Sequence, residues 1–567
     1  MGWYLVYFMH RHLDFRKQEL QALADLFGAG DTVAWRRPFG EIEHSPLWYV
    51  WLPSDDLARK IVERSILTKA LIEVWGEGED DEELNASIAD ATTFLPPDAQ
   101  KQFLAENTTF KVVNEDFGFR ERGTSVDPFG PVRRRMETLA PVVQFKGKAK
   151  MKDFDNLFYH VETCCSAHGH KETGLPMDIP ARKYFGRVVG LGKGRAAIPM
   201  YDLTKRRYLG PTSMDVELGL IMANMIHARS GGVVWDPFCG TGSILVSAAH
   251  FGAMTLGTDI DIRVIKFGKV DKKTNERVDV WSNFSDYGLP APIGLLRMDL
   301  HKHSFAFKQT HTEGFLQGVV GDPPYGVRAG GRKSGGRKRN NDGSVPRVPD
   351  KFKNDHIPST VPYPFSECMD DLMDNASRLL GVGGRLAFFM PCAADADDAR
   401  CAGADETPSH PMLRLVAKSD QMLSTRWGRR LVTFEKIVPY DEKVAKKARA
   451  ELNKERNENG GMEDLLQRMR EVVYHGERAA EKKKKETAKL ERTKLRGAEV
   501  WDPRKEEGGG DEKNDEDDDT KKKDEAEKNE TPRFGPGDVV GKRHALHSAA
   551  GSKMEPARRE KFRGKCT

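Results

Sequence analysis

Hydrophobic and polar positions alternate over short distances in the first part of the chain. Strands are predicted at Trp3–Met9 and Leu47–Leu52, where aromatic and branched apolar residues run together between polar ones. Apolar residues at helical spacing predict two helices, one carrying Leu20, Leu23, Leu26 and Phe27 and the other carrying Ile61, Ile66, Leu67, Leu71 and Ile72. Strands and helices at this spacing predict a small α+β module.

A weaker pattern covers residues 93 to 200. Short strands are predicted at Phe110–Val113 and Tyr184–Val189. These pieces fit a second α+β module, so we assign residues 1–200 to an α+β region.

A regular alternation of buried strands and helices begins at about residue 208. The predicted strands are Val233–Trp235, Met254–Gly257, Gly294–Arg297, Leu316–Val320 and Arg385–Phe389, and the predicted helices are Ser243–Phe251, a run from Asp261, and Glu367–Leu380. Such alternation is typical of an α/β domain with a doubly wound, mostly parallel sheet. Two later apolar runs, Leu413–Ala417 and Leu431–Ile437, predict a closing antiparallel hairpin, which ends this domain at residues 208–440.

Charged residues dominate the remainder, residues 441–567. This tail is rich in Lys and Glu to about Leu495, acidic from Glu506 to Asp519, and mildly basic at its end. We expect its first stretch to form an exposed charged helix and the rest to be disordered. For the basic pieces Lys482–Lys485 and Arg558–Lys565, a solvated tail is favoured over a localisation or binding role.

Charge and cysteine content narrow the picture. The net charge of +4 over 567 residues is small, so any nucleic-acid surface must be a local patch. Seven scattered cysteines argue against a disulfide framework and for a reducing compartment. Cys164 and Cys165 lie near His160, His168 and His170, but no second half of a zinc site follows, and no metal is predicted. Because no apolar stretch approaches the length of a membrane span, we expect no membrane partner and a cytoplasmic protein, with a nuclear pool as the alternative.

A glycine turn, Asp236–Ser243, follows a buried strand and opens a helix. Open α/β sheets bind their ligands at such a position, and Gly240 and Gly242 allow the backbone to approach an anionic group. A dinucleotide fingerprint would need a third glycine where Leu245 stands, and no Walker A sequence occurs, which disfavours NAD and ATP. The turn instead suits S-adenosylmethionine, whose carboxylate would meet the helix start.

Three carboxylates complete this candidate cofactor site. Asp236 could accept a hydrogen bond from the ammonium group of S-adenosylmethionine. Asp259 ends the next strand, where a carboxylate can bind both ribose hydroxyls. Asp299 follows the third strand and is placed to meet the adenine amine.

The tetrapeptide Asp322-Pro323-Pro324-Tyr325 follows the apolar strand Leu316–Val320. It therefore projects from the same carboxyl edge as the glycine turn. The Asp322 carboxylate and the Pro323 carbonyl can hold the N–H groups of an aromatic amine, so that its lone pair points at a methyl carbon. The carboxylate also stabilises the positive charge that develops on nitrogen. Pro323 and Pro324 stiffen the loop, and Tyr325 can stack on an extruded base.

A basic stretch lies directly downstream. Residues 328–353 contain nine Lys or Arg against two Asp. Two interpretations of this stretch are equally favoured. In one, residues such as Arg328, Arg332 and Lys333 contact phosphates; in the other, the stretch is a disordered surface insertion. Arg429 and Arg430 are two further candidates for RNA contact.

Together these motifs make the chain resemble a known family, the tRNA guanosine-10 N2-methyltransferases of the eukaryotic, two-subunit type. The resemblance runs from about residue 1 to 440 and rests on the segments 15–19 (FRKQE), 184–187 (YFGR), 208–215 (YLGPTSMD), 236–242 (DPFCGTG), 257–261 (GTDID), 322–326 (DPPYG) and 429–433 (RRLVT). Departures are Cys239 within the glycine turn, the basic insertion and the charged tail. These departures leave open where the loops lie and where the protein is localised. They do not affect the expected chemistry.

The resemblance implies a ferredoxin-like piece followed by a THUMP domain that engages tRNA, and then a Rossmann-like class I methyltransferase domain. It also implies that Thr212, Ser213 and Met214 pack over the methionine end of the cofactor. The cofactor contacts expected in all are Thr212, Ser213, Met214, Asp236, Pro237, Gly240, Gly242, Asp259, Ile260 and Asp299. The implied product is N2-methylguanosine, and the implied partner is a small zinc-binding activator protein.

Two alternatives stay open at this point. Asp322 could equally accept the N–H groups of the adenine N6 amine in DNA or RNA, or of a protein glutamine amide, since each is an amine in a planar system. A non-catalytic RNA-binding module that retains the fold is the other alternative, although intact Asp259 and Asp322 count against it. The sequence leaves open which tRNAs are used and whether one or two methyl groups are added.

Overall fold

The computed structural model describes most of the first 459 residues. The described ranges are 2–37, 45–90, 92–117, 127, 130–163, 182–210, 212–302, 314–325, 330–336, 359–394, 401–402, 407–423 and 427–459. The chain divides into two units, residues 1–490 and 491–567, and every described residue belongs to the first. Most of the tail, including both of its basic pieces, lies outside the described residues.

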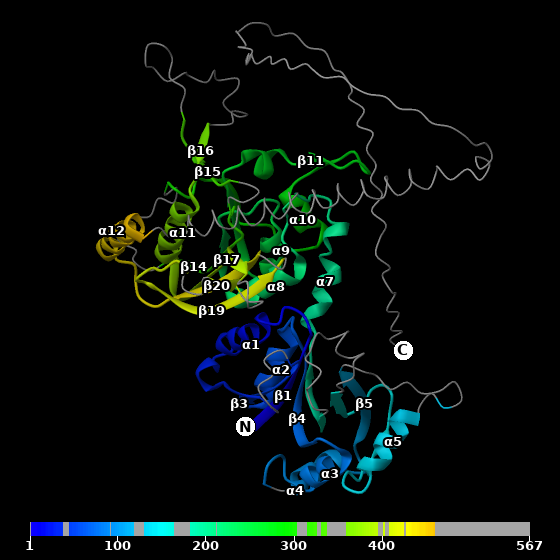
Figure 1. Ribbon diagram of the computed structural model, residues 1–567. Helices are drawn as coiled ribbons and strands as arrows, with labels where there is room; N and C mark the ends of the chain where they lie inside the picture. The colour runs from blue at the N-terminus through cyan, green and yellow to red at the C-terminus, as the bar shows by residue number, and fades with distance from the viewer. Residues whose placement is uncertain are drawn as a thin grey trace, which may run out of the picture. The chain divides into compact units, whose positions relative to one another are not determined.

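The N-terminal region is built on one mixed sheet rather than on two separate modules (Figure 1). Its strands are β1 (Gly2–Phe8), β2 (Ala34–Arg36), β3 (Leu47–Leu52), β4 (Thr68–Gly78), β5 (Thr109–Phe117), β6 (Lys148–Ala149), β7 (Asn156–Thr163) and β8 (Arg182–Leu191), in the order β2-β3-β1-β4-β8-β7-β5-β6. The accompanying helices are α1 (Phe15–Leu26), α2 (Asp55–Arg64), α3 (Asp81–Ala89), α4 (Pro97–Leu104) and α5 (Gly130–Leu139). The two predicted modules share this sheet because β4 pairs antiparallel with β8.

One predicted helix was wrong in its second half. The helix that contains Ile61 ends at Arg64, and Leu71 and Ile72 belong to strand β4. The buried Glu19 carboxylate accepts the backbone N–H groups of both Ile66 and Leu67, at 2.9 Å each. These N–H groups are therefore directed to a side chain from α1 instead of to helical carbonyls, and the chain turns into a strand.

The second sheet has the predicted doubly wound form. Its strands are β9 (Val233–Asp236), β10 (Met254–Asp259), β13 (Gly294–Arg297), β14 (Leu316–Gly321), β17 (Leu380–Ala394), β18 (Cys401–Ala402), β19 (Leu413–Met422) and β20 (Trp427–Lys436). The order is β13-β10-β9-β14-β17-β20-β19, with β18 paired to β17. The neighbouring strands β13, β10, β9, β14 and β17 run parallel to one another. Strand β20 runs antiparallel to its two neighbours, β17 and β19, which confirms the closing hairpin. The order reverses between β9 and β14, so a crevice is expected at their carboxyl ends.

Helices accompany this sheet. They are α7 (Ala197–Met200), α8 (Val216–Met225), α9 (Ser243–His250), α10 (Val280–Asp286) and α11 (Phe365–Leu379). The predicted helices Ser243–Phe251 and Glu367–Leu380 are confirmed as α9 and α11. The helical run expected from Asp261 was wrong, because only one π-helical turn, Arg263–Phe267, forms before a small hairpin of β11 (Lys269–Val270) and β12 (Arg277–Val278). Gly268 ends the turn with a positive φ of 60°, which a continuing helix does not allow.

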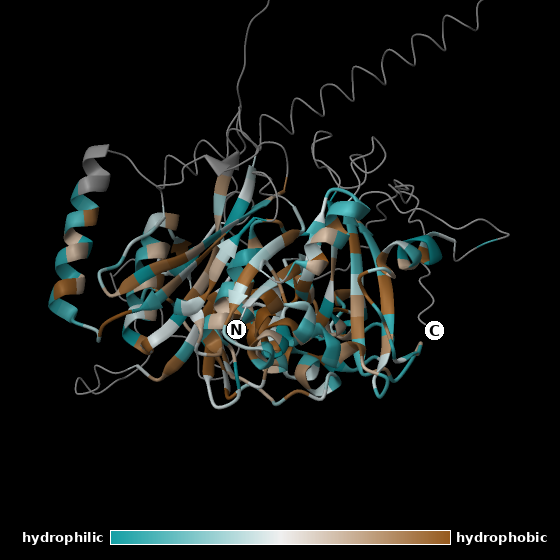
Figure 2. Cartoon of the chain, turned by 90° about the horizontal axis from the view of Figure 1, so that it is seen from below, coloured by the Kyte–Doolittle hydropathy of each residue, from teal (hydrophilic) through white to brown (hydrophobic). Residues whose placement is uncertain are grey.

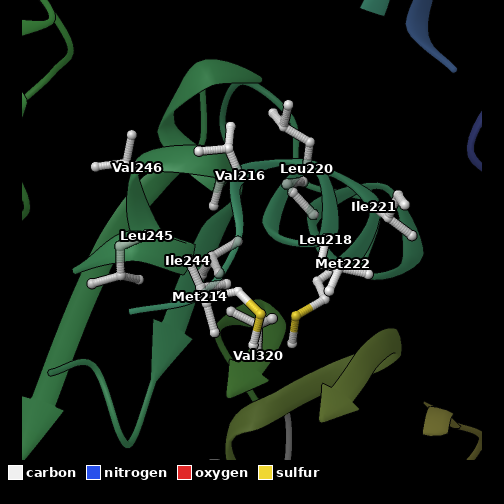
Figure 3. Close-up of a cluster of buried hydrophobic side chains, with 14 of the residues drawn as sticks. Met214, Val216, Leu218, Leu220, Ile221, Met222, Ile244, Leu245, Val246 and Val320 are labelled. Atoms are coloured by element: carbon white, nitrogen blue, oxygen red, sulfur yellow. The ribbon is translucent and has the colours of Figure 1, made fainter. Parts of the chain in front are cut away.

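Apolar side chains form one core on each side of the second sheet. In Figure 2, which colours the chain by hydropathy, hydrophobic residues (brown) recur along the strands and the helices. One of the two cores joins α8, α9 and β14, and Figure 3 shows Met214 beside Ile244 and Val320 in that cluster. The same core takes in Phe15, Ile66 and Leu67 from the N-terminal region. Polar contacts add to this junction, since Asn224 donates to Glu19 at 2.7 Å and Arg385 pairs with Asp25 at 2.6 Å.

The described cysteines differ in their state. Cys239 and Cys368 are free and buried, whereas Cys392 is disulfide-bonded, a pairing that the cysteine pattern did not predict. The start of the tail forms α12 (Glu442–Asn459), whose Ala445 is buried. Among the described helices, none has both the length and the apolar character needed to cross a bilayer.

Candidate active site

The glycine turn between β9 and α9 is held by backbone hydrogen bonds, within the turn and to the neighbouring strand β10. Cys239 donates its N–H to the Thr258 carbonyl at 3.0 Å, and Gly242 donates to the Cys239 carbonyl at 2.7 Å. Gly242 caps α9 with a φ of 80°, and no side chain caps that helix. The first N–H groups of α9 are therefore available to an anionic ligand.

Asp236 lies at the end of β9 and is 1% exposed. One of its oxygens accepts the Phe238 N–H at 2.9 Å. Burial raises the pKa of this carboxyl well above its ordinary value; the Phe238 N–H opposes the rise, while the carboxylates of Asp259 and Asp322 add to it. Three carboxylates thus act on one another here, and a positively charged ligand would relieve their repulsion.

Asp259 closes β10 beside the glycine turn. Its two oxygens accept the N–H groups of Gly240 at 3.0 Å and Asp261 at 2.9 Å. Burial raises the pKa of this carboxyl, and both N–H groups oppose that rise. Ile260 is the next residue, half-buried at the same edge of the sheet.

Asp299 follows β13 and is also placed at the carboxyl edge. One oxygen accepts the His301 N–H at 3.1 Å, and the other accepts the Ser334 N–H at 2.8 Å. Ser334 belongs to β15 (Arg332–Ser334), which pairs with β16 (Thr360–Pro362). The small hairpin is therefore fastened to the carboxylate that the sequence assigned to the adenine amine.

Asp322 follows β14, and its two oxygens have different neighbours. Tyr325 donates its hydroxyl hydrogen to Oδ1. The Arg429 guanidinium lies 3.6 Å from Oδ2. Burial raises the pKa of Asp322, and the Tyr325 hydroxyl and the Arg429 charge oppose that rise. Pro323 is buried and Pro324 half-buried between Asp322 and Tyr325, as a stiff loop requires.

The segment that precedes α8 links both halves of the site. Ser213 Oγ lies 3.1 Å from Thr241 Oγ1 in the glycine turn and accepts the Gly210 N–H at 3.2 Å. Met214 is buried, and its sulfur lies 3.7 Å from Arg429. Thr212 is exposed, and Pro237 is buried behind the turn.

The basic residues expected at RNA have varied surroundings. Arg332 is exposed and donates to Thr360, whereas Lys333 pairs with Glu367 at 2.5 Å. Arg430 is 7% exposed on its side chain and pairs with Asp420 at 2.7 Å. Arg328 lies outside the described residues. Contact with RNA remains a prediction for each of them.

Sequence reasoning missed the environment of Arg429. It placed this residue among the RNA contacts, but the side chain is 14% exposed and turned toward Asp322. Gln421 was missed entirely, although it accepts the Arg429 Nε–H at 2.8 Å. Adjacent strand residues face opposite sides of the sheet, so only one of Arg429 and Arg430 can be directed at Asp322. This alternation does not tell which one.

A metal-like grouping lies beyond Asp299. His301, Glu367 and Asp371 bring ligand atoms within 4.8 Å of one another. Lys333 pairs with Glu367 at 2.5 Å, and Arg449 pairs with Asp371 at 2.6 Å. These cations already balance both acids. Of the cysteine and histidine cluster weighed earlier, only His160 is described, buried in β7.

Two protein-family models match the chain. Residues 3–194 match the Tmrp11 THUMP N-terminal domain, and residues 204–337 match the RMKL-like methyltransferase domain. The first covers the N-terminal sheet, and the second covers the glycine turn and Asp322. A solved structure, TrmN from Thermus thermophilus, is similar over 77% of this chain and all of its own, at 15% identity and a TM-score of 0.32.

Curated relatives are similar over most of their length. The tRNA (guanine(10)-N(2))-methyltransferase TRMT11 of Dictyostelium discoideum is 34% identical over 78% of this chain and 84% of its own. The Saccharomyces cerevisiae tRNA (guanine(10)-N(2))-methyltransferase is 33% identical over 76% and 92%. The Homo sapiens TRMT11 is 31% identical over 78% and 89%. With a THUMP-type region, a methyltransferase domain and Asp322 beside the glycine turn, the chain belongs to the tRNA (guanine(10)-N(2))-methyltransferase family.

Proposed function

We propose that this chain transfers a methyl group from S-adenosylmethionine to the exocyclic N2 amine of guanosine 10 in tRNA. The observation that carries the proposal is that β9 and β14 are parallel neighbours, so that Asp236 and Asp322 lie at the same edge of the sheet. A loop suited to holding an amine and a turn suited to holding a methyl donor thus share one crevice.

The residues at this edge fit S-adenosylmethionine. Asp236 is a buried acid whose ionisation is opposed by two other acids, and a ligand bearing an ammonium and a sulfonium group would offset that repulsion. The uncapped start of α9 suits the ligand's carboxylate, and Asp259 suits its ribose hydroxyls. When bound, the cofactor supplies a methyl group on a positively charged sulfur.

The catalytic loop orients the amine. Asp322 and the Pro323 carbonyl accept its N–H groups and direct the nitrogen lone pair out of the base plane, toward the donor. The Asp322 carboxylate offsets the positive charge that grows on nitrogen. Because the Tyr325 hydroxyl lies on Asp322 Oδ1, this contact must yield to the amine as the base enters. The Tyr325 ring then stacks on the base.

The proposed substrate is supported by the relatives' names and by the THUMP-type region, and the proposed partner rests on the family resemblance alone. The region matching the THUMP model would hold tRNA, and the basic residues near Asp322 would contact its phosphates. We further propose that a small zinc-binding protein activates the chain and that the complex works in the cytoplasm.

Nucleoside mass spectrometry tests this function. Purified full-length chain, with and without the activator, would be incubated with S-adenosylmethionine and a tRNA transcript. We expect N2-methylguanosine from a transcript with guanosine at position 10 and none at that position from a transcript with inosine there, because inosine lacks the amine. Equal methylation of both transcripts, or methylated adenosine instead of N2-methylguanosine, would overturn the proposal.

A further inference from the structure

We infer that Arg429 is a positioning residue for methyl transfer, which fixes the orientation and the charge of the Asp322 carboxylate. The inference rests on the proposed function and deepens it. Neither the sequence motifs nor the family resemblance gives Arg429 this role. The contacts of its guanidinium carry the argument.

The topology brings Arg429 to the catalytic edge. Strand β17 runs parallel to β14, with Gly321 opposite Phe388. Strand β20 runs antiparallel to β17, with Arg429 opposite Pro391. The beginning of β20 therefore lies where β14 ends, next to the loop of Asp322.

The guanidinium of Arg429 is held on several sides. Its Nε donates to Gln421 Oε1 at 2.8 Å, and its carbon lies 4.2 Å from the centre of the Phe389 ring. These contacts leave the two terminal nitrogens directed at the site. Nη1 lies 3.6 Å from Asp322 Oδ2, and Nη2 lies 3.7 Å from the Met214 sulfur. One rigid group thus touches both the catalytic loop and the segment preceding α8.

The charge of Arg429 has a specific consequence for Asp322. The ionisable groups that act on this carboxylate from the described elements are Tyr325 on its own loop, Arg429 on β20 and Asp236 at the end of β9. Asp236 repels the ionised form, and burial disfavours it. Arg429 supplies the compensating positive charge, 3.6 Å from the carboxylate. A protonated Asp322 would lose the negative charge that offsets the growing charge on the amine.

A phosphate contact is the competing role for Arg429. Its side chain is only 14% exposed and is already engaged by Asp322 and Gln421, which favours the positioning role. The two roles also differ in what they control. Phosphate contact would change tRNA affinity and its salt dependence, whereas positioning would change the methyl-transfer step and its pH dependence.

Single-turnover methylation across about pH 6 to 9 tests the inference, with saturating tRNA and S-adenosylmethionine and the full chain with its activator. For Arg429→Met we expect a rate on the order of 10-fold lower at neutral pH. We also expect the acidic limb of the pH profile to move to higher pH, because without the Arg429 charge the pKa of Asp322 rises further. Arg429→Lys keeps the positive charge, so its acidic limb should lie at the same pH as in the wild type, and its rate should lie between those of Arg429→Met and the wild type. The matched control is Arg414→Met, which removes an exposed arginine of the same hairpin paired with Glu435 at 3.2 Å.

A second variant covers the case in which Arg429→Met does not fold. Gln421→Leu leaves the charge in place but removes the hydrogen bond that aims it, and we expect a lower rate with an unshifted limb. An Arg429→Met profile that coincides with wild type, or a variant that only needs more tRNA to reach the wild-type single-turnover rate, would overturn the inference. An inactive wild-type enzyme would instead contradict the proposed function.

Discussion

Tyr325 donates its hydroxyl to Asp322, so the residue expected to stack on the base also covers the acceptor expected to hold it. The two roles of Tyr325 can be separated by mutation. Tyr325→Ala removes the ring and should weaken base capture by roughly 1 to 3 kcal/mol, seen as a higher tRNA KM. Tyr325→Phe keeps the ring and should leave that KM nearly unchanged. If both variants raise KM equally, stacking is not what the ring provides.

Asp322 should matter much more for methyl transfer than for cofactor binding, because it has the weakest influence among the groups that shift the pKa of Asp236. Asp322→Ala is expected to lower turnover on the order of 10²-fold or more, because the carboxylate that stabilises the growing charge on nitrogen is lost from a half-buried site. Calorimetric titration with S-adenosylmethionine should give an affinity close to wild type. A variant that binds the cofactor and retains wild-type turnover would point to another group as the stabiliser.

Gly242 should be required for the cofactor beyond its effect on stability. Its φ is 80°, and a Cβ there would lie 2.8 Å from Val280. Gly242→Ala is therefore expected to cost about 1 kcal/mol or more of the free energy of unfolding and to abolish measurable S-adenosylmethionine binding. Gly288→Ala is the control, since Gly288 has a φ of 63° with open space around its Cβ. That control should share the backbone strain and keep cofactor affinity.

His160 should make the fold sensitive to acid. It is fully buried in β7, and neither ring nitrogen has a hydrogen-bond partner among the described residues. Burial lowers the pKa of His160 to about 4, with the charges of Arg135 and Lys183 adding to the effect. Between the ordinary histidine pKa of about 6.5 and this value, the unfolded chain binds a proton that the folded chain does not, so stability falls as pH falls.

Urea denaturation at pH 7 and pH 5 measures this effect. One such histidine corresponds to a loss of about 2 kcal/mol between these pH values. His160→Leu should remove about that share of the acid loss while filling the same apolar site. An acid loss that is unchanged in the variant would mean that other groups bind the proton.

Much of the second sheet and of the site could be predicted from local patterns. Each strand that ends in a functional residue is short, apolar and followed by polar or glycine residues, as in β9 with Asp236 and β14 with Asp322. Because parallel strands end at one edge, their order along the chain is enough to bring these residues together. The meeting of Asp236 with Asp322 therefore did not depend on details of packing.

Only the tertiary structure decided where local patterns allow two outcomes. The helix that begins at Asp55 could have continued through Ile66, but Glu19 from α1 takes the N–H groups that a longer helix needs. The pairing of β4 with β8, which merges two modules into one sheet, involves residues too distant in sequence for any periodicity to show. Likewise, the alternation at Arg429 and Arg430 shows that the two point to opposite faces, but not which one meets Asp322. That choice depends on the register of β20 against β17, which is set by contacts along the whole hairpin and not by the two residues themselves.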